Sequence, residues 1–176
     1  HCPECKEAEA TLDRWSRLLE HPDPYIACEQ VNVPGRLEEL LSHEQSGGLQ
    51  LIATNDDYHS WALCWALIRE SFERRFHRPD SYGDLAALAV AISRRLDEGF
   101  YGASRCADLR ARALANAANA QRTLGHLGLA EQTFGEALTW IGRGTGRPGV
   151  LAETLCLQAS LKSARRRHDE AMDFFL

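Results

Sequence analysis

The sequence predicts an all-α protein built from stacked antiparallel helical hairpins. Apolar residues recur with helical spacing along most of the chain, and no segment alternates with a period of two over the length of a strand. One hairpin pattern also occurs twice, as Gly125-x4-Ala130-x3-Phe134-x2-Ala137 and again in part as Ala171-x3-Phe175. Repeated hairpins bury their apolar faces against neighbours and leave a concave surface suited to a partner.

Composition narrows the classes of partner. The 176 residues suffice for about three to four repeat units. The net charge is −5, and the 20 basic residues form no stripe, which disfavours nucleic-acid binding. The longest apolar-rich piece, residues 61–68, is too short to span a bilayer, so we expect no membrane partner. Four of the six cysteines are scattered through the chain, which fits a reducing cytoplasm.

Residues 1–53 are expected to form an N-terminal helical segment and a connector. A helix over residues 4–20 places Leu12, Trp15, Leu18 and Leu19 on one face, and the run His21-Pro22-Asp23-Pro24 ends it. A short helix is predicted at 35–43, and Ser46-Gly47-Gly48 is expected to break it.

Residues 54–176 are expected to be the repeat region. Asn55 or Asp56 would cap the first helix, whose stripe is Trp61, Cys64, Trp65, Ile68, Phe72 and Phe76. After Pro79, the motif Ser81-x2-Asp84 resembles a capping box for a returning helix with the stripe Leu85, Leu88, Ala89, Ile92 and Leu96. Gly99 would close this hairpin.

Two further hairpins follow. The second is predicted over 104–141 with its turn at Gly125-His126-Leu127-Gly128, and the third from about 149 with its turn at 166–169. The chain starts at His1 and ends inside a helical pattern at Phe174-Phe175-Leu176, so we expect a fragment of a longer protein. Apolar surface at such an end would favour self-association.

The second hairpin resembles a tetratricopeptide repeat. The resemblance is carried by Ala117-Ala118-Asn119-Ala120-Gln121-x3-Gly125 and by the Ala130, Phe134 and Ala137 positions that follow. Leu114 stands where the motif usually has Trp, and Gln121 where it has Tyr. The likeness extends over residues 55–176 and implies a solenoid of the tetratricopeptide type.

The same resemblance implies a binding groove. In such stacks the first helix of each hairpin lines the concave face, which would present Arg112, Asn116, Asn119 and Arg122. Asn offers donors and acceptors and Arg grips a carboxylate, so this set suits an extended peptide or a chain terminus. We expect Arg112 and Arg122 to be exposed, whereas Asn119 could equally bond the backbone of the neighbouring repeat.

The first residues resemble the zinc-binding motif of anti-sigma factors. His1, Cys2 and Cys5 stand at the start of a predicted helix, where the helix dipole favours thiolates that can hold Zn²⁺. Further ligands would come from His21, Cys28 or residues upstream. The alternatives are a frayed end or a redox dithiol, although the latter lacks its usual βαβ setting. Beyond this zinc, no cofactor is required.

No catalytic motif accompanies these features. The formal G-x-G-x-x-G match at Gly144, Gly146 and Gly149 follows a helix and contains Pro148, so a flexible turn between repeats is expected. We therefore expect a non-enzymatic scaffold that binds a protein or peptide in its groove, in bacterial regulation or signalling. The alternatives are the scaffold of a larger effector or enzyme whose catalytic domain lies elsewhere, and a zinc-binding anti-sigma-like transcription regulator.

Overall fold

The computed structural model describes residues 24–75 and 79–165. Over these residues it contains nine α-helices, one 3-10 turn and no strand, which confirms the all-α class. The elements are α2 (Pro24–Gln30), α3 (Val33–Ser42), α4 (Gln45–Thr54), η1 (Asp56–Tyr58), α5 (Trp61–Arg74), α6 (Pro79–Ser93), α7 (Glu98–Tyr101), α8 (Ala103–Thr123), α9 (Leu127–Ile141) and α10 (Pro148–Ala164).

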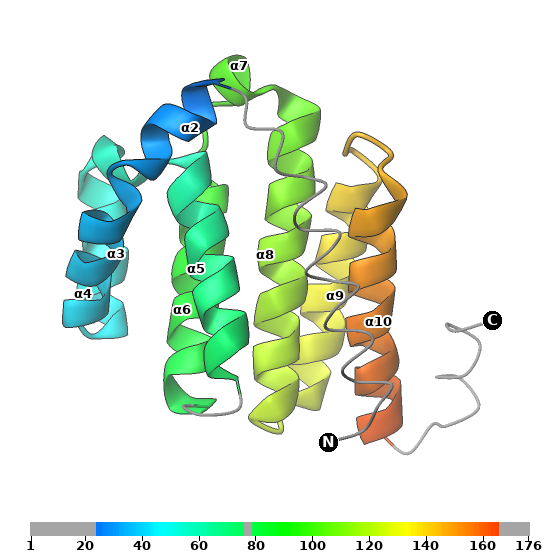
Figure 1. The fold of residues 1–176 in the computed structure, drawn as a ribbon. Coiled ribbons are helices and arrows are strands. Elements are labelled where there is room, and N and C mark those ends of the chain that lie inside the picture. Colours follow the sequence, from blue (N-terminus) through cyan, green and yellow to red (C-terminus); the bar gives the residue numbers. More distant parts are fainter. Residues whose placement is uncertain (1–23, 76–78, 166–176) are drawn as a thin grey trace.

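The long helices lie in two rows (Figure 1). α3, α5, α8 and α10 stand side by side in one row, and α4, α6 and α9 lie behind them. α5 packs on α6, α8 packs on α6 and α9, and α10 packs on α8 and α9. We call the outward surface of α5, α8 and α10 the front face.

Glu29 of α2 is hydrogen-bonded to the N-terminal end of α5. The Glu29 carboxylate accepts hydrogen bonds from Ser60 Oγ at 2.7 Å and from the Ala62 N–H at 3.0 Å. The Tyr101 hydroxyl donates to the other carboxylate oxygen. A negative charge at a helix N-terminus is favourable because unpaired N–H groups and the helix dipole meet it there. α2 therefore marks the end of the molecule at which α5 and α8 begin.

The starts of the first hairpin differ from those predicted. Asn55 caps the 3-10 turn η1, whereas Ser60 caps α5 by accepting a hydrogen bond from the Leu63 N–H at 3.2 Å. α6 begins at Pro79, so Ser81 lies inside the helix and the predicted capping box is wrong. Proline suits a first helical position because its missing N–H would be unpaired there. The predicted apolar stripe from Leu85 to Ile92 is buried in α6 as expected, and Leu96 is buried just beyond the end of the helix at Ser93.

Two predicted glycine breaks are also wrong. Gly47 and Gly48 lie within α4, and a Cβ on Gly48 would come 3.0 Å from Leu88 Cδ2. The glycine therefore allows α4 to approach α6 closely. Gly99 lies within α7, and the chain turns instead at Gly102, whose φ of +87° is the left-handed conformation that glycine adopts readily.

The second hairpin lies where the sequence predicts it. α8 and α9 meet at a turn in which Gly125 has a φ of +83°. Ala118 of α8 and Ala130, Phe134 and Ala137 of α9 are completely buried in one cluster with Leu161 of α10. Small residues at the crossing let the two helices pack closely. The predicted third hairpin turn, at 166–169, lies outside the described residues.

Candidate functional site

α8 is the structural centre of the candidate site. Each of its residues from 107 to 120 is buried, including five polar or charged ones: Asp108, Arg110, Arg112, Asn116 and Asn119. Buried polar groups are costly unless they are hydrogen-bonded, so the partners of these side chains define what the helix can do.

Arg112 is not exposed, and the prediction that it would be is wrong. It is only 8% exposed, and its Nε and Nη2 atoms donate to the two Glu153 oxygens at 2.9 and 3.3 Å. Its guanidinium also lies 5.2 Å from the centre of the Trp65 ring. Arg112 therefore links α5, α8 and α10 at the front face instead of presenting a free charge.

Asn116 and Asn119 belong to a buried polar network. Asn116 Nδ2 donates to Ser71 Oγ on α5, and the Tyr82 hydroxyl of α6 lies 3.2 and 3.3 Å from the Asn116 backbone and side-chain oxygens. Asn119 Nδ2 donates to the Tyr82 oxygen at 2.8 Å. Asn119 thus bonds a side chain of the preceding hairpin, where the sequence suggested either its backbone or a ligand. With 4% and 3% exposure, neither asparagine presents a surface for a peptide.

Burial raises the pKa of Tyr82 to about 12, although the Asn119 hydrogen bond and nearby arginines oppose the shift. The phenol therefore remains protonated at neutral pH and serves as both donor and acceptor. Tyr82 consequently joins the two asparagines into one network across α5, α6 and α8.

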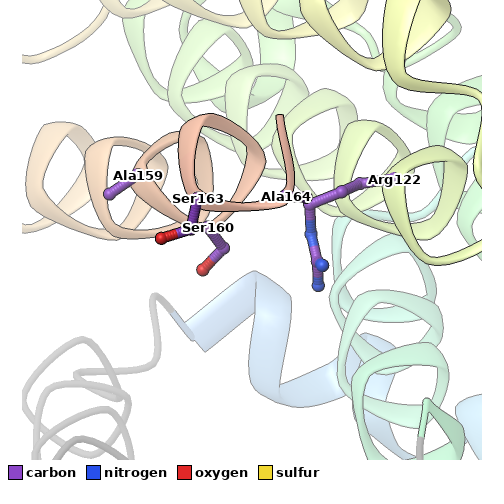
Figure 2. Close-up of a pocket in the computed structure, with 5 residues that line it drawn as sticks. All are labelled: Arg122, Ala159, Ser160, Ser163 and Ala164. Atoms are coloured by element: carbon purple, nitrogen blue, oxygen red, sulfur yellow. The ribbon is translucent and has the colours of Figure 1, made fainter. Parts of the chain in front are cut away.

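Arg122 ends this network at the surface. Its Nε donates to Asn119 Oδ1 at 2.9 Å, and the side chain is half-buried. In the described part of the chain, its terminal nitrogens have no carboxylate or carbonyl partner. The guanidinium borders a shallow pocket of about 470 Å³ whose other lining residues are on α10: Ala159, Ser160, Ser163 and Ala164 (Figure 2). Of the four predicted groove residues, Arg122 alone offers a cation to a partner.

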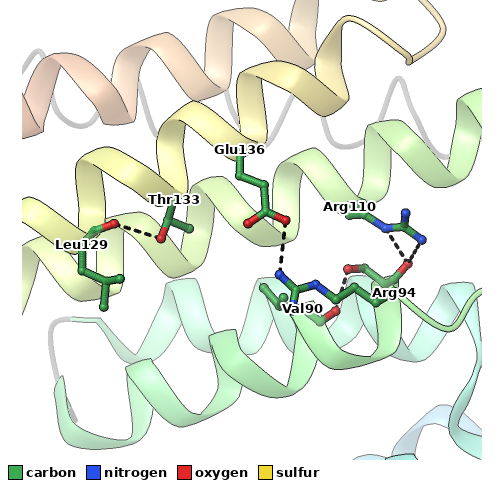
Figure 3. Close-up of polar contacts among 7 residues, drawn as sticks. Val90, Arg94, Arg110, Leu129, Thr133 and Glu136 are labelled. Atoms are coloured by element: carbon green, nitrogen blue, oxygen red, sulfur yellow. Dashed lines mark hydrogen bonds and ion pairs between the residues drawn. The ribbon is translucent and has the colours of Figure 1, made fainter.

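A second arginine holds the rear row in place. Arg110 donates from Nε and Nη2 to the Ser93 carbonyl at 3.1 and 2.9 Å, at the C-terminus of α6 (Figure 3). Its guanidinium lies 4.2 Å from the centre of the Trp140 ring of α9. A cation at a helix C-terminus is favourable because the last carbonyls are unpaired and carry partial negative charge. At the surface, an exposed ion pair at 3.2 Å joins Arg94, which directly follows α6, to Glu136 of α9.

The loop before α10 is tied to α8 by Asp108. Its two carboxylate oxygens accept from the Thr145 N–H at 3.1 Å and from Thr145 Oγ1 at 2.5 Å. A Cβ on Gly144 would come 2.0 Å from Asp108 Oδ1, so glycine is needed there for space. The turn predicted to be flexible is therefore anchored to α8 at Thr145.

Large apolar side chains recur along α5, and three of them, Trp61, Trp65 and Ile68, pack against the core cluster. Trp61, Trp65, Ile68 and Phe72 follow one another at helical spacing, and each is partly buried. The Trp61 and Trp65 rings stack with their centres 6.0 Å apart. The Trp61 Nε1–H is buried and has no hydrogen-bond partner within the described residues.

The predicted zinc ligands His1, Cys2 and Cys5 lie outside the described residues, so the zinc site remains a prediction. Among the residues that are described, no group of three or more His, Cys, Asp or Glu side chains could hold a metal ion. Cys28, a suggested further ligand, is a free, exposed thiol. Burial raises the pKa of Cys64 and of Cys106, and both are free thiols in the core.

Sequence analysis missed several partners that shape this site: Tyr82, Ser71, Glu153 and Trp65. One signal was available, because Ser71 occupies a buried position of α5, on the same face as Cys64 and Leu67. A polar residue on a buried face requires a partner, and Asn116 supplies it. Nothing in the spacing connects Tyr82 with Asn119 or Arg112 with Glu153, because those pairs depend on how the helices are placed.

Two further findings concern membranes and similarity to known proteins. Within the part of the chain that the structure describes, no helix is long and apolar enough to cross a membrane. The chain matches no protein-family model, and comparisons with curated proteins and with solved structures found no match.

Proposed function

We propose that the protein is a non-enzymatic interaction scaffold whose helical hairpins stack in the manner of tetratricopeptide repeats. Support comes from the two rows of helices, the tight α8–α9 pair and the front face shared by α5, α8 and α10. In such an arrangement a partner would contact the row that contains the first helix of each pair.

The observation that carries this proposal is Arg122. Its Nε is held by Asn119, so the guanidinium has a fixed orientation, while its terminal nitrogens remain available beside the pocket of α10. A fixed guanidinium loses little conformational entropy on binding, and it matches the geometry of a carboxylate. An acidic peptide segment therefore fits this end of the front face.

The buried polar groups support binding over catalysis. Tyr82 and the cysteines Cys64 and Cys106 have raised pKa values, which keep them protonated and unreactive at neutral pH. Asn116 and Asn119 are saturated by neighbours inside the fold. These side chains hold helices together.

The test is selection from a phage-displayed peptide library, followed by affinity measurements on the enriched peptides. Arg122→Glu should weaken their binding at least tenfold, since it replaces an attractive charge with a repulsive one. Arg94→Glu is the matched control, because Arg94 is an exposed arginine whose partner, Glu136, lies on the rear helix α9. Peptides that bind the parent and both variants equally would contradict the proposal, as would failure to enrich any peptide.

A regulatory role that depends on zinc is part of the same proposal, since His1, Cys2 and Cys5 resemble the anti-sigma motif. We predict one zinc ion per chain in the full-length protein, measured by elemental mass spectrometry. The Cys2→Ser/Cys5→Ser double variant should lose it, because two thiolate ligands are removed. An unchanged zinc content in the variant, or no zinc in the parent, would remove the zinc-dependent role and leave the scaffold.

A further inference from the structure

The hydrogen bonds of the buried polar network all run in one direction, from Arg122 at the surface toward α5. Arg122 Nε donates to Asn119 Oδ1 at 2.9 Å, and Asn119 Nδ2 donates to the Tyr82 oxygen at 2.8 Å. The Tyr82 hydroxyl in turn donates to the backbone and side-chain oxygens of Asn116 at 3.2 and 3.3 Å. Asn116 Nδ2 donates to Ser71 Oγ on α5. The network is therefore a chain in which each side chain accepts from its outer neighbour and donates to its inner one.

The direction of this chain is set at its inner end. Ser71 has a single hydroxyl proton, which it donates to the Ile68 carbonyl at 3.0 Å, so toward Asn116 it accepts. The Asn116 amide must then turn its nitrogen to Ser71 and its oxygen to Tyr82. Tyr82 likewise has one proton, and it is present at neutral pH because burial raises the pKa of Tyr82 to about 12. With that proton donated to Asn116, the Tyr82 oxygen is left to accept from Asn119.

We propose that Tyr82 is a positioning residue for the binding site at Arg122, a role that acts through Asn119 and rests on the proposed function. The Asn119 amide has a donor end and an acceptor end, and only the oxygen can accept from Arg122 Nε. Because the Tyr82 oxygen accepts the Asn119 Nδ2–H in the interior, Asn119 Oδ1 faces Arg122. Tyr82 thereby orients a guanidinium that it does not touch.

The outer bond alone would hold the guanidinium weakly. Arg122 is half-buried, so water competes for its Nε–H and for the oxygen of Asn119. The inner bond is protected, because Asn119 is 3% exposed and Tyr82 is completely buried. An Asn119 amide that turned away from Tyr82 would leave a buried polar group unpaired, which is costly. The interior therefore determines where Asn119 points, and Arg122 follows.

This arrangement connects two neighbouring hairpins. Ser71 and Tyr82 belong to α5 and α6, whereas Arg122 of α8 borders the pocket whose other lining residues are on α10 (Figure 2). A partner at that pocket is thus bound by a cation that the preceding hairpin holds in place. Since coupling is reciprocal, a partner that requires the fixed guanidinium also strengthens the contact of α8 with α6.

The mobility of the Arg122 side chain tests this role without any partner. In the full 176-residue chain, NMR relaxation gives the order parameter of the Arg122 Nε–H bond, and the loss of this signal in Arg122→Lys identifies it. The parent value should be about 0.85, as for rigid backbone amides, and Asn119→Leu should lower it below about 0.6 by removing the acceptor. Tyr82→Phe leaves Asn119 in place, yet it should lower the order parameter to the same range.

Two control variants separate positioning from a general loss of stability. Gly144→Ala should destabilise the protein to a similar extent by displacing Asp108, which lies 14 residues before Arg122 on α8. Tyr58→Phe removes the hydroxyl of another buried tyrosine, whose partner Glu39 is outside the network. Both variants should leave the Arg122 order parameter at the parent value, because neither alters the hydrogen bonds that lead to Asn119.

Three results would overturn the proposal: an unchanged order parameter in Tyr82→Phe, an equal fall in Gly144→Ala, or a parent value already below about 0.6. The enriched peptides of the phage selection add a second readout, since Tyr82→Phe should weaken their binding several-fold and Tyr58→Phe should not. If Tyr82→Phe releases Arg122 but no peptide is enriched, the positioning of Arg122 by Tyr82 stands and the proposed function fails.

Discussion

Tyr82 is the residue on which the buried polar network depends. Its oxygen accepts from Asn119, and its proton is shared between two oxygens of Asn116. Tyr82→Phe keeps the ring but leaves the Asn119 amide without its acceptor. We expect the free energy of unfolding, measured by urea denaturation, to fall by about 1–3 kcal/mol.

Tyr58→Phe is the matched control for this variant. The Tyr58 ring is equally buried, at 3% exposure, but its hydroxyl donates to Glu39, an exposed residue that water can solvate instead. This change should cost less than about 1 kcal/mol. If both variants lost the same free energy of unfolding, the hydrogen bonds of Tyr82 to the two asparagines would contribute no more than a single hydroxyl contact at the surface.

The same tyrosine predicts a loss of stability in alkali. Burial raises the pKa of Tyr82 to about 12, above the value of about 10 expected in the unfolded chain. Since the folded state favours the protonated form, this contribution is complete below about pH 10 and is lost as pH rises through about 12. Urea unfolding at a series of pH values should show the decline, and Tyr82→Phe should make it shallower. Identical slopes in parent and variant would assign the decline to other groups.

Residue chemistry was predictable only where the environment of a residue followed from its own helix. The burial of Leu85, Ala89 and Ile92 followed from spacing within α6. The burial of Arg112 did not, because Glu153 and Trp65 lie 41 and 47 residues away in the sequence and meet it only through packing. Arginine is usually exposed, so the sequence favoured the wrong environment.

At the scale of elements, one substitution tests how the loop between α9 and α10 is held. Gly144→Ala would place a Cβ 2.0 Å from Asp108 Oδ1 and so break the two hydrogen bonds to Thr145. We expect a loss of about 1–3 kcal/mol from overpacking and lost charge-assisted bonds. The freed loop should also be cut faster by trypsin after Arg143.

The control for this loop variant is Gly149→Ala. Gly149 lies in the first turn of α10, and a Cβ there meets nothing within 4 Å. Alanine should be neutral or stabilising by up to about 1 kcal/mol, since it restricts the unfolded chain. If Gly144→Ala and Gly149→Ala gave the same trypsin sensitivity, Asp108 would not be what anchors the loop.

Helix bodies were easier to predict than helix ends. The stripes of α5, α6, α8 and α9 repeat over three or more turns, so they identify each helix independently of its neighbours. The ends of helices and the breaks between them depend on one or two residues, and a residue such as glycine can serve more than one role there. In the sequence Gly48 indicates a break, because its need for space against Leu88 is visible only once α4 and α6 are packed together.

At the scale of the whole molecule, the long helices form two rows, and their contacts are mainly between neighbours. The all-α class and the α8–α9 pair could be predicted, since both follow from local patterns. The burial of residues 106–120 of α8 could not, because it depends on how other helices pack against α8. The boundary predicted between residues 53 and 54 remains a prediction, although α4 packs on α6 across it.

Because the helices contact mainly their neighbours, we expect a destabilising substitution at α10 to loosen α10 and to leave distant helices unaffected. Glu153 is the only described carboxylate paired with Arg112, and its side chain is 24% exposed. Glu153→Gln leaves the Arg112 charge buried without an opposite charge, and we expect a loss of about 1–3 kcal/mol, reduced from the fully buried case by solvent. Glu136→Gln removes the exposed Arg94 pair in the same way and should cost below about 1 kcal/mol.

Hydrogen exchange followed by mass spectrometry distinguishes a local effect from a global one. In Glu153→Gln, amides of α10 should exchange faster with solvent. Among the described helices, α10 packs substantially against α8 and α9 only, so few contacts hold it in place. Amides of α3 and α4, at the other end of the row, should keep their protection. Uniform acceleration in all helices would mean that the molecule unfolds as one cooperative unit. The front face could then not open at α10 without loss of the whole fold.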